Sequence, residues 1–205
     1  MKTPRVEIDL EKVIHNIQLL KEYYGSKGIT IIGVTKAVCG HLDIANVLVK
    51  SGIKILADSR IANIKKMRNA GIEAQFLLLR TPLPSELNDV IAFADISHNT
   101  EPAIIEKLSK IAINHGVIHQ VILMVELGDL REGILPSNLT PIITKIKQLR
   151  GIELVGIATN LACFGGIIPD DKNMTNLSNL AINIERDFNL DFTFISGGNS
   201  SNYNW

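Results

Sequence analysis

The sequence predicts an α/β fold built around a parallel sheet. Short apolar runs alternate with longer segments in which apolar residues recur at helical spacing. The runs Gln75-Phe76-Leu77-Leu78-Leu79 and Val121-Ile122-Leu123-Met124-Val125 are apolar almost throughout, as in strands covered on both faces. Three helical segments are followed by Gly52, Gly71 and Gly116, and glycine just past a helix is a stop signal.

The elements follow one another in a regular order. Residues 5–10 alternate between charged and apolar side chains and predict a half-exposed strand. Apolar residues of a helix then recur from Leu10 to Leu20, ahead of Gly25. Seven buried strands are expected over residues 31–36, 55–59, 75–80, 95–99, 120–127, 152–161 and 192–199. Helices are expected between them, with apolar positions over residues 44–48, 61–67 and 104–111.

The spacing of these strands favours a TIM-type (β/α)8 barrel. Counted from residues 31, 55, 74, 95, 119, 152 and 192, successive runs begin 24, 19, 21, 24, 33 and 40 residues apart, and such a barrel repeats units of this size over about 250 residues. Seven strands is one short, so an incomplete barrel is expected, forming one domain over residues 1–205. The segment contains no Pro- or Ser-rich linker and no close repeat.

Composition gives no indication of a nucleic-acid or membrane partner. The 205 residues include 21 basic and 21 acidic side chains, and 46% of them are hydrophobic, enough for a sizeable core. No export signal core and no run of 18 apolar residues occurs. Cys39 and Cys163 are far apart and lack the spacing of a metal site. A soluble protein of the reducing cytoplasm is expected, without a metal.

Lys36 ends the first apolar run, Ile31-Ile32-Gly33-Val34-Thr35-Lys36. Lysine is rarely buried without a partner, and burial would lower its pKa and free the neutral amine that forms Schiff bases with carbonyls. The alternative is an ordinary lysine whose ammonium reaches solvent at the strand end.

Polar groups also end the other runs, where parallel barrels place their active sites. They are Asp58-Ser59, Arg80, His98-Asn99, Glu126 with Asp129 and Arg131, Thr159-Asn160, and the turn Ser196-Gly197-Gly198-Asn199-Ser200-Ser201. A lysine, arginines, amides and a glycine-rich turn would suit a cofactor with an aldehyde and a phosphate, and pyridoxal 5'-phosphate (PLP) has both. Alternatively, the strands simply exit into polar loops.

Four segments resemble the alanine racemase family, in the family order. Residues 34–41 resemble its PLP-lysine motif, residues 126–133 its D-T-G-M-x-R-x-G segment, residues 156–161 its G-x-x-T-H-F segment, and residues 196–201 its N-S turn. The amino-acid sequences of residues 56–60, 124–133 and 159–161 are more similar to the ornithine racemase branch of the family. The resemblance implies a PLP-dependent amino-acid racemase of alanine or ornithine type.

The resemblance also implies roles for individual residues. Lys36 would hold the cofactor as an imine and act as one of two groups that remove and return the α-proton. Arg131 would contact the phenolic oxygen of PLP. Asn160 stands where alanine racemases have a histidine packed on the pyridine ring. Ser200 would bind the phosphate, with Asn199 preceding it.

Some positions depart from the family or have simpler explanations. Cys39 is nearest to the place of a phosphate-binding tyrosine, and a small packed residue is expected there. Asp129 and Glu132 flank Arg131 and could serve only to hold it. Arg80 could pair with Glu86 in a solvated loop contact.

In full-length relatives, an eighth strand and a C-terminal β domain would follow. The strand over residues 5–10 would pair with that domain, and the complete protein would be a homodimer. The second acid/base group would lie outside residues 1–205, so these residues alone are expected to be poorly active. Two other functions stay open: a single-domain PLP-homeostasis protein, or a non-catalytic barrel remnant. The substrate amino acid is not specified by the sequence.

Overall fold

The computed structural model describes residues 4–198 and residue 200. It divides the chain into two compact units, unit 1 over residues 1–77 and unit 2 over residues 78–205. The sequence predicts one domain over these residues.

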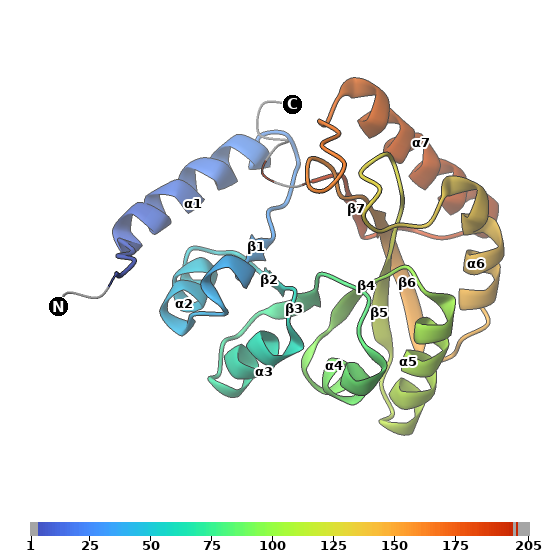
Figure 1. The fold of residues 1–205 in the computed structure, drawn as a ribbon, viewed down its shortest axis with the longest axis horizontal. Helices are drawn as coiled ribbons and strands as arrows, with labels where there is room; N and C mark the ends of the chain where they lie inside the picture. Colours follow the sequence, from blue (N-terminus) through green and yellow to red (C-terminus); the bar gives the residue numbers. More distant parts are fainter. Residues whose placement is uncertain (1–3, 199, 201–205) are drawn as a thin grey trace. The chain divides into compact units, whose positions relative to one another are not determined.

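Unit 1 alternates strands and helices in the predicted order (Figure 1). Its elements are α1 (Leu10–Gly25), β1 (Gly33–Val34), the short 3-10 helix η1 (Lys36–Val38), α2 (Leu42–Lys50), β2 (Ile55–Asp58), α3 (Ile61–Asn69) and β3 (Gln75–Leu78), whose last residue belongs to unit 2. β1 and β2 are parallel, with Gly33 opposite Leu56 and Val34 opposite Ala57.

The core of unit 1 forms where helix faces meet strand side chains. Ile64 and Met67, three residues apart on α3, are fully buried, as the helical spacing predicted. Leu56 of β2 and Phe76 of β3 are also fully buried. Helix α1 packs against α2 and is tied to its end by Lys21, whose ammonium donates to the Ser51 carbonyl at 2.7 Å.

The expected strand over residues 5–10 is not formed. Residues 4–9 have no regular structure, and Leu10 is already the first residue of α1. The Asp9 carboxylate caps that helix by accepting from the N–H groups of Glu11 and Lys12, at 3.0 and 3.2 Å. Val6 is 87% exposed, and an alternating segment needs a neighbouring strand to bury its apolar side. Its pairing with a further domain stays a prediction.

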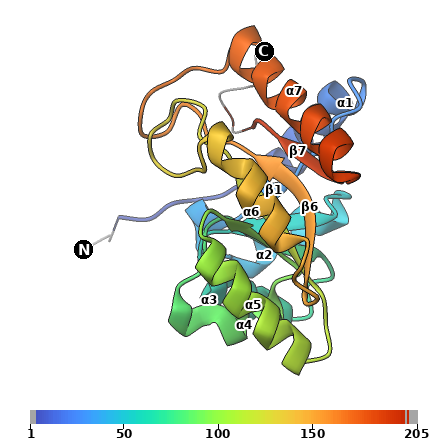
Figure 2. The same cartoon turned by 90° about the vertical axis from the view of Figure 1, so that its right-hand side faces the viewer.

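Unit 2 continues the alternation. Its elements are η2 (Pro84–Glu86), α4 (Leu87–Phe93), β4 (Ile96–Asn99), α5 (Pro102–Asn114), β5 (His119–Met124), η3 (Pro136–Asn138), α6 (Leu139–Ile146), β6 (Ile152–Ala158), α7 (Asp171–Phe188) and β7 (Phe194–Ser196). The strands lie side by side in the order β4-β5-β6-β7, and each pair is parallel. Helices α5, α6 and α7 lie along one side of these strands (Figures 1 and 2).

The centre of unit 2 is the pair β5 and β6. Ile122, Leu123 and Met124 of β5 are at most 2% exposed, as their continuously apolar run predicted. The register between β5 and β6 shifts by one residue after Val121, where Ile122 lies opposite Gly156. Such an irregularity places glycine where another backbone comes close.

Helix ends agree with the glycine signals. Gly52, Gly71 and Gly116 each lie one residue past a helix C-cap and have positive φ angles of 89°, 77° and 68°. Helix α7 had not been singled out in the sequence. It begins with a capping box in which Asp170 and Asn173 each accept a hydrogen bond from the other's backbone N–H.

Two histidines are buried in the sheet of unit 2. His119 is 2% exposed, and its Nε2 lies 2.8 Å from the Ser97 hydroxyl. Burial lowers the pKa of His119 to about 4, although the Asp95 charge and a hydrogen bond with the Ala94 backbone oppose that shift. Burial alone lowers the pKa of His98 to about 4. Both rings are therefore neutral in the folded chain near pH 7.

Acid is expected to destabilise unit 2 through these histidines. The unfolded chain binds protons below pH about 6.5, whereas the folded chain does not do so until about 4, so stability falls as pH drops through that window. Each histidine contributes at most about 3 kcal/mol. Urea unfolding of the chain from pH 7 to pH 4 should show this slope, and His119→Gln should reduce it. His15→Gln, at an exposed position of α1, is the control; an equal effect there would contradict the assignment.

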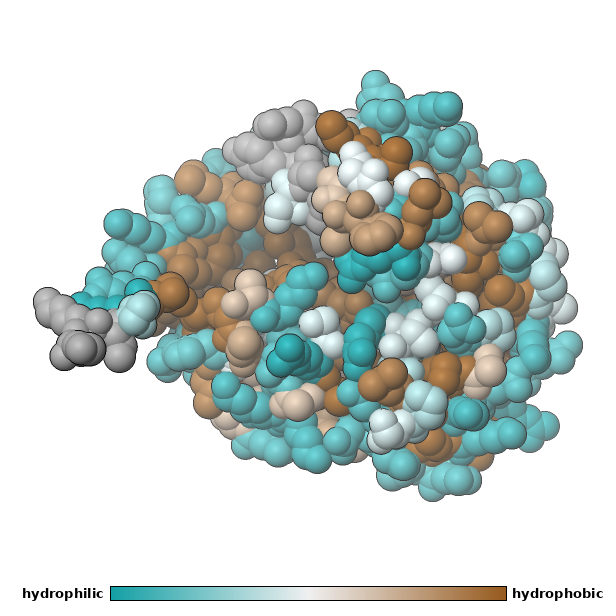
Figure 3. All heavy atoms as spheres, in the orientation of Figure 1, coloured by the Kyte–Doolittle hydropathy of each residue, from teal (hydrophilic) through white to brown (hydrophobic). Residues whose placement is uncertain are grey.

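The outer edge of unit 2 in Figure 3 is mainly hydrophilic, with isolated hydrophobic side chains among the polar ones. Such a helix surface is ordinary for a domain in water. Across the described residues, no helix combines the length and the apolar character that a membrane crossing requires.

Candidate active site

In unit 1, Lys36 is the first residue of η1, two residues after the end of β1. Its side chain is exposed, and the predicted burial is wrong. Strand β1 covers two residues rather than the six of the apolar run. Exposed and buried side chains alternate across its end, with Val34 49% exposed, Thr35 fully buried and Lys36 exposed, so the lysine falls on the exposed side.

The lysine turn is anchored by a buried contact between Thr35 and Asp58. Thr35 and Asp58 are both fully buried, and the Thr35 hydroxyl donates to Asp58 Oδ2 at 2.9 Å. The other oxygen of Asp58 accepts from the Arg60 N–H at 2.9 Å and from Asn63 Nδ2 at 3.0 Å. One carboxylate therefore joins β2, the start of α3 and the residue before Lys36. Sequence reasoning had noted Asp58 only as a strand end.

The turn closes through left-handed backbone at Cys39 and Gly40, with φ angles of 51° and 59°. The Gly40 N–H donates to the Thr35 carbonyl at 3.2 Å, and the Cys39 N–H donates to the Lys36 carbonyl at 3.2 Å. Cys39 is exposed, so the expectation of a small packed residue is wrong. The left-handed backbone at Cys39 and Gly40 lets the chain reverse direction before α2.

In unit 2, Arg131 lies in the loop that follows β5. The loop returns to the strand end, where Val125 bridges Ile134. Within the loop, one oxygen of the Glu126 carboxylate accepts from the N–H groups of Gly128 and Leu130, at 2.5 and 3.2 Å. At Gly133, φ is 144° and an added Cβ would lie 2.6 Å from the Glu126 nitrogen, so only glycine fits. These contacts hold the loop that carries Arg131.

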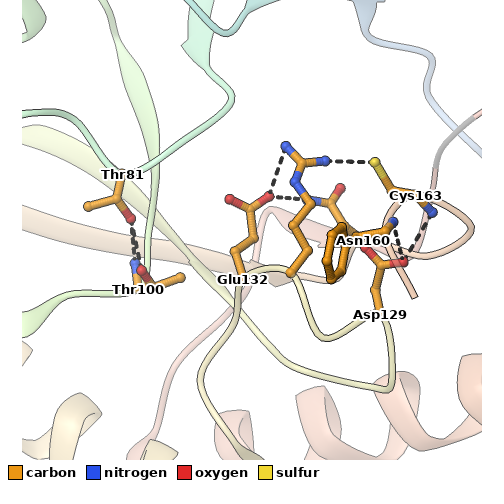
Figure 4. Close-up of polar contacts among 8 residues, drawn as sticks. Thr81, Thr100, Asp129, Glu132, Asn160 and Cys163 are labelled. Carbon is orange, nitrogen blue, oxygen red and sulfur yellow. Dashed lines mark hydrogen bonds and ion pairs between the residues drawn. The ribbon is translucent and has the colours of Figure 1, made fainter. Parts of the chain in front are cut away.

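The Arg131 guanidinium lies between two side chains from different parts of the chain (Figure 4). Its Nη1 donates to the Cys163 sulfur at 2.8 Å, and its Nη2 lies 3.6 Å from Glu132 Oε1. Asn160 Nδ2 donates to the same Glu132 oxygen. The structure thus brings together two of the predicted site residues, Arg131 and Asn160, through Glu132. It confirms that Glu132 holds Arg131.

Asp129 holds a loop rather than the arginine. It is 1% exposed, and its Oδ1 accepts from the N–H groups of Cys163, Phe164 and Gly165, each at 3.0 Å. Burial would raise the pKa of Asp129, but these donors, with the Arg131 charge, together hold it below its ordinary value. The carboxylate is therefore ionised at neutral pH and fixes the segment that carries Cys163.

Replacing Asp129 with alanine is expected to loosen residues 163–165. Three backbone N–H groups would lose one charged acceptor, and their hydrogen exchange should accelerate by about tenfold or more. Because the pKa of Asp129 is lowered, its contribution is present above about pH 4 and is lost as pH falls through the folded value. Exchange followed by mass spectrometry checks this, with Asp187→Ala at an exposed carboxylate as the control. Unchanged protection in the Asp129 variant would contradict the anchoring role.

Three buried polar atoms of unit 2 have no hydrogen-bond partner within the described part of the chain: Arg80 Nε, Asn99 Oδ1 and Thr159 Oγ1. They follow or end β3, β4 and β6, at the carboxyl ends of these strands. Buried polar groups are normally satisfied, so these atoms are available to a bound group or to water. Arg80 and Thr159 offer donors there, which suits an anion.

Arg80 also forms the predicted pair with Glu86, whose Oε2 accepts from Nη2 at 2.6 Å. The pair is less solvated than expected, since the two side chains are 33% and 24% exposed. Beside it, the Thr81 and Thr100 hydroxyls lie 3.0 Å apart and join the loops after β3 and β4 (Figure 4).

The proposed phosphate turn is described only in part. Ser200 is exposed, close after β7, while Asn199 lies outside the described residues. An added Cβ at Gly197 would lie 2.5 Å from the Met174 sulfur, so the turn runs tightly along α7. The functions of Ser200 and Asn199 stay predictions.

Residues 8–205 match the family described as alanine racemase, N-terminal domain. The chain belongs to this family. It is 38% identical to ornithine racemase of Acetoanaerobium sticklandii, over 97% of the chain and 56% of the relative. It is 36% identical to lysine racemase of Thermotoga maritima, over 98% of the chain and 56% of the relative. The chain therefore spans about half the length of these curated relatives.

A solved structure supports the fold. Alanine racemase of Clostridium difficile 630, in complex with cycloserine, superposes with a TM-score of 0.78 at 23% identity, over 94% of this chain and 53% of that one. Together with the seven strands and alternating helices formed by the described residues, this confirms the predicted incomplete TIM-type barrel.

Proposed function

We propose that this chain is the cofactor-carrying part of a PLP-dependent amino-acid racemase. Its family membership and its identity to two curated racemases support this proposal. The observation that carries it is the contact set around Arg131, in which a guanidinium and the Asn160 amide share one carboxylate. An arginine that only reaches into solvent from a loop would not need its guanidinium held by Glu132 and Cys163.

The residues present suit PLP. Arg80 and Thr159 each have an unpaired buried donor, and Arg131 has a guanidinium held in the loop after β5, so unit 2 offers donors to an anionic group. PLP, when bound, supplies an electron sink that makes the α-proton of an amino acid acidic.

Each site residue has a task in this proposal. The Lys36 amine would hold the cofactor covalently and would move the α-proton on one face of the substrate. Arg131 would donate to the phenolic oxygen, and Asn160 would lie against the ring without titrating, since an amide carries no ionisable proton. Ser200 and Asn199 would bind the phosphate.

The substrate proposed is a diamino acid of the ornithine or lysine type. The two curated relatives with that activity share 36–38% identity with this chain over nearly all of its length. Curated alanine racemases share 28–31% over at most 83% of it. The higher identity favours a basic side chain over a methyl group.

The test is a substrate panel on the complete racemase proposed here, loaded with PLP, because residues 1–205 alone are expected to be poorly active. Each enantiomer of ornithine, lysine and alanine is incubated in turn, and chiral chromatography measures the opposite enantiomer. Conversion of ornithine or lysine at least about tenfold faster than alanine is expected. PLP binding without conversion of any of them would favour the PLP-homeostasis function instead, and no PLP binding would leave the non-catalytic remnant.

A further inference from the structure

Glu132 contacts both predicted cofactor residues of unit 2. Its Oε1 accepts a hydrogen bond from Asn160 Nδ2 and lies 3.6 Å from Arg131 Nη2 (Figure 4). Arg131 and Asn160 come from loops that follow different strands, β5 and β6. One carboxylate oxygen therefore sets the separation of two groups that the chain itself leaves independent.

The opposite side of the guanidinium is fixed as well. Arg131 Nη1 donates to the Cys163 sulfur. The backbone N–H of Cys163 in turn donates to Asp129 Oδ1 at 3.0 Å. Arg131 is thus held between Glu132 and a segment that is itself anchored. With 38% of its side-chain surface exposed, Arg131 would otherwise sample many rotamers.

We propose that Glu132 is a positioning residue that fixes Arg131 and Asn160 as one unit and offsets the arginine charge felt by the cofactor. This inference rests on the proposed function, because it concerns the same cofactor residues. The carboxylate has two separable effects. Its oxygen receives the two donors, and its negative charge balances the guanidinium. A neutral amide in its place keeps an acceptor but loses the charge.

Two substitutions separate these effects. Glu132→Gln leaves the positive charge of Arg131 uncompensated, which disfavours a protonated, cationic chromophore nearby. The pH midpoint of the bound cofactor's absorbance is expected to fall by about one unit. Glu132→Ala removes the acceptor too, and PLP dissociation is expected to become about tenfold easier, because hydrogen bonds to charged groups are lost.

The matched control is Glu106→Gln. Glu106 pairs with Lys145 through a similarly exposed carboxylate of the same unit, on α5, and it belongs to no predicted site. PLP titration and absorbance from pH 5 to pH 10 are measured for the wild type and all three variants, and circular dichroism reports the folding of each. A midpoint shift in Glu132→Gln but not in Glu106→Gln supports the proposal.

Unchanged midpoint and affinity in both Glu132 variants would overturn the positioning role. An equal shift in the Glu106 variant would overturn it too, since a general charge effect would then account for the change. Failure of the proposed function is distinguishable, because it would appear in the wild type as an absence of PLP attached to Lys36 after borohydride reduction. Glu132→Gln keeps the shape of the side chain, so it tests the inference even if Glu132→Ala fails to fold.

Discussion

Lys36→Ala is expected to abolish covalent attachment of PLP and to lower racemisation by at least about a thousandfold. No other side chain in the proposed site can form the same bond to an aldehyde, and the same amine is proposed to move the α-proton. The protein is incubated with PLP, reduced with borohydride and digested, and mass spectrometry locates the modified lysine. The Lys36 peptide is expected to carry the cofactor in the wild type.

Two controls make this result specific. Lys66→Ala removes an exposed lysine from α3 in the same unit and should leave labelling at Lys36 intact. Lys36→Arg keeps the positive charge but not the reactive amine, so it should lose labelling as completely as alanine does. Labelling spread over many surface lysines in the wild type would show that exposure alone, not a site, governs the reaction, and would contradict the proposal.

Gly156→Ala is expected to destabilise the chain by about 3 kcal/mol or more and to displace β7. Gly156 lies opposite Phe194 in the pairing of β6 with β7, and an added Cβ would lie 2.0 Å from the Phe194 carbonyl oxygen. Neither backbone can move away without breaking the hydrogen bonds that pair β6 with β7. Because Ser200 follows β7 closely, the proposed phosphate turn should move as well.

Urea unfolding measures the loss of stability, and hydrogen exchange over residues 194–196 reports on the strand. Gly25→Ala is the control, since nothing lies within 4 Å of an added Cβ at that helix end. It should be neutral or slightly stabilising. A Gly156 variant as stable as the Gly25 variant would contradict the close approach of the two strands.

The fold was predictable where apolar runs are continuous. Leu77 and Leu78 of β3, and Leu123 of β5, are buried as their runs required. Strand ends were less predictable, because apolar side chains such as Ile31 and Ile32 precede β1 without joining it. Helix α7 was overlooked amid its many polar residues. Its buried positions do follow helical spacing: Met174, Leu177, Ala181 and Ile184.

The site was predictable only in its local parts. Arg131 was found from its own segment, and the adjacent Glu132 was correctly expected to hold it. The contact between Arg131 and Cys163 joins residues 32 positions apart, and no local sequence pattern predicts such a pair. Asp129 was expected to hold Arg131 as well, yet its carboxylate accepts from backbone N–H groups of a distant loop. A backbone partner leaves no signature in the sequence.

The buried Asp58 has a consequence for protein engineering. Its carboxylate contacts Thr35, the Arg60 backbone and the Asn63 amide, so the conformation of the Lys36 turn is encoded about twenty residues downstream of it. Transplanting residues 34–41 alone onto another scaffold would carry the proposed nucleophile without its support. A successful graft has to include the second strand and the first turn of the following helix.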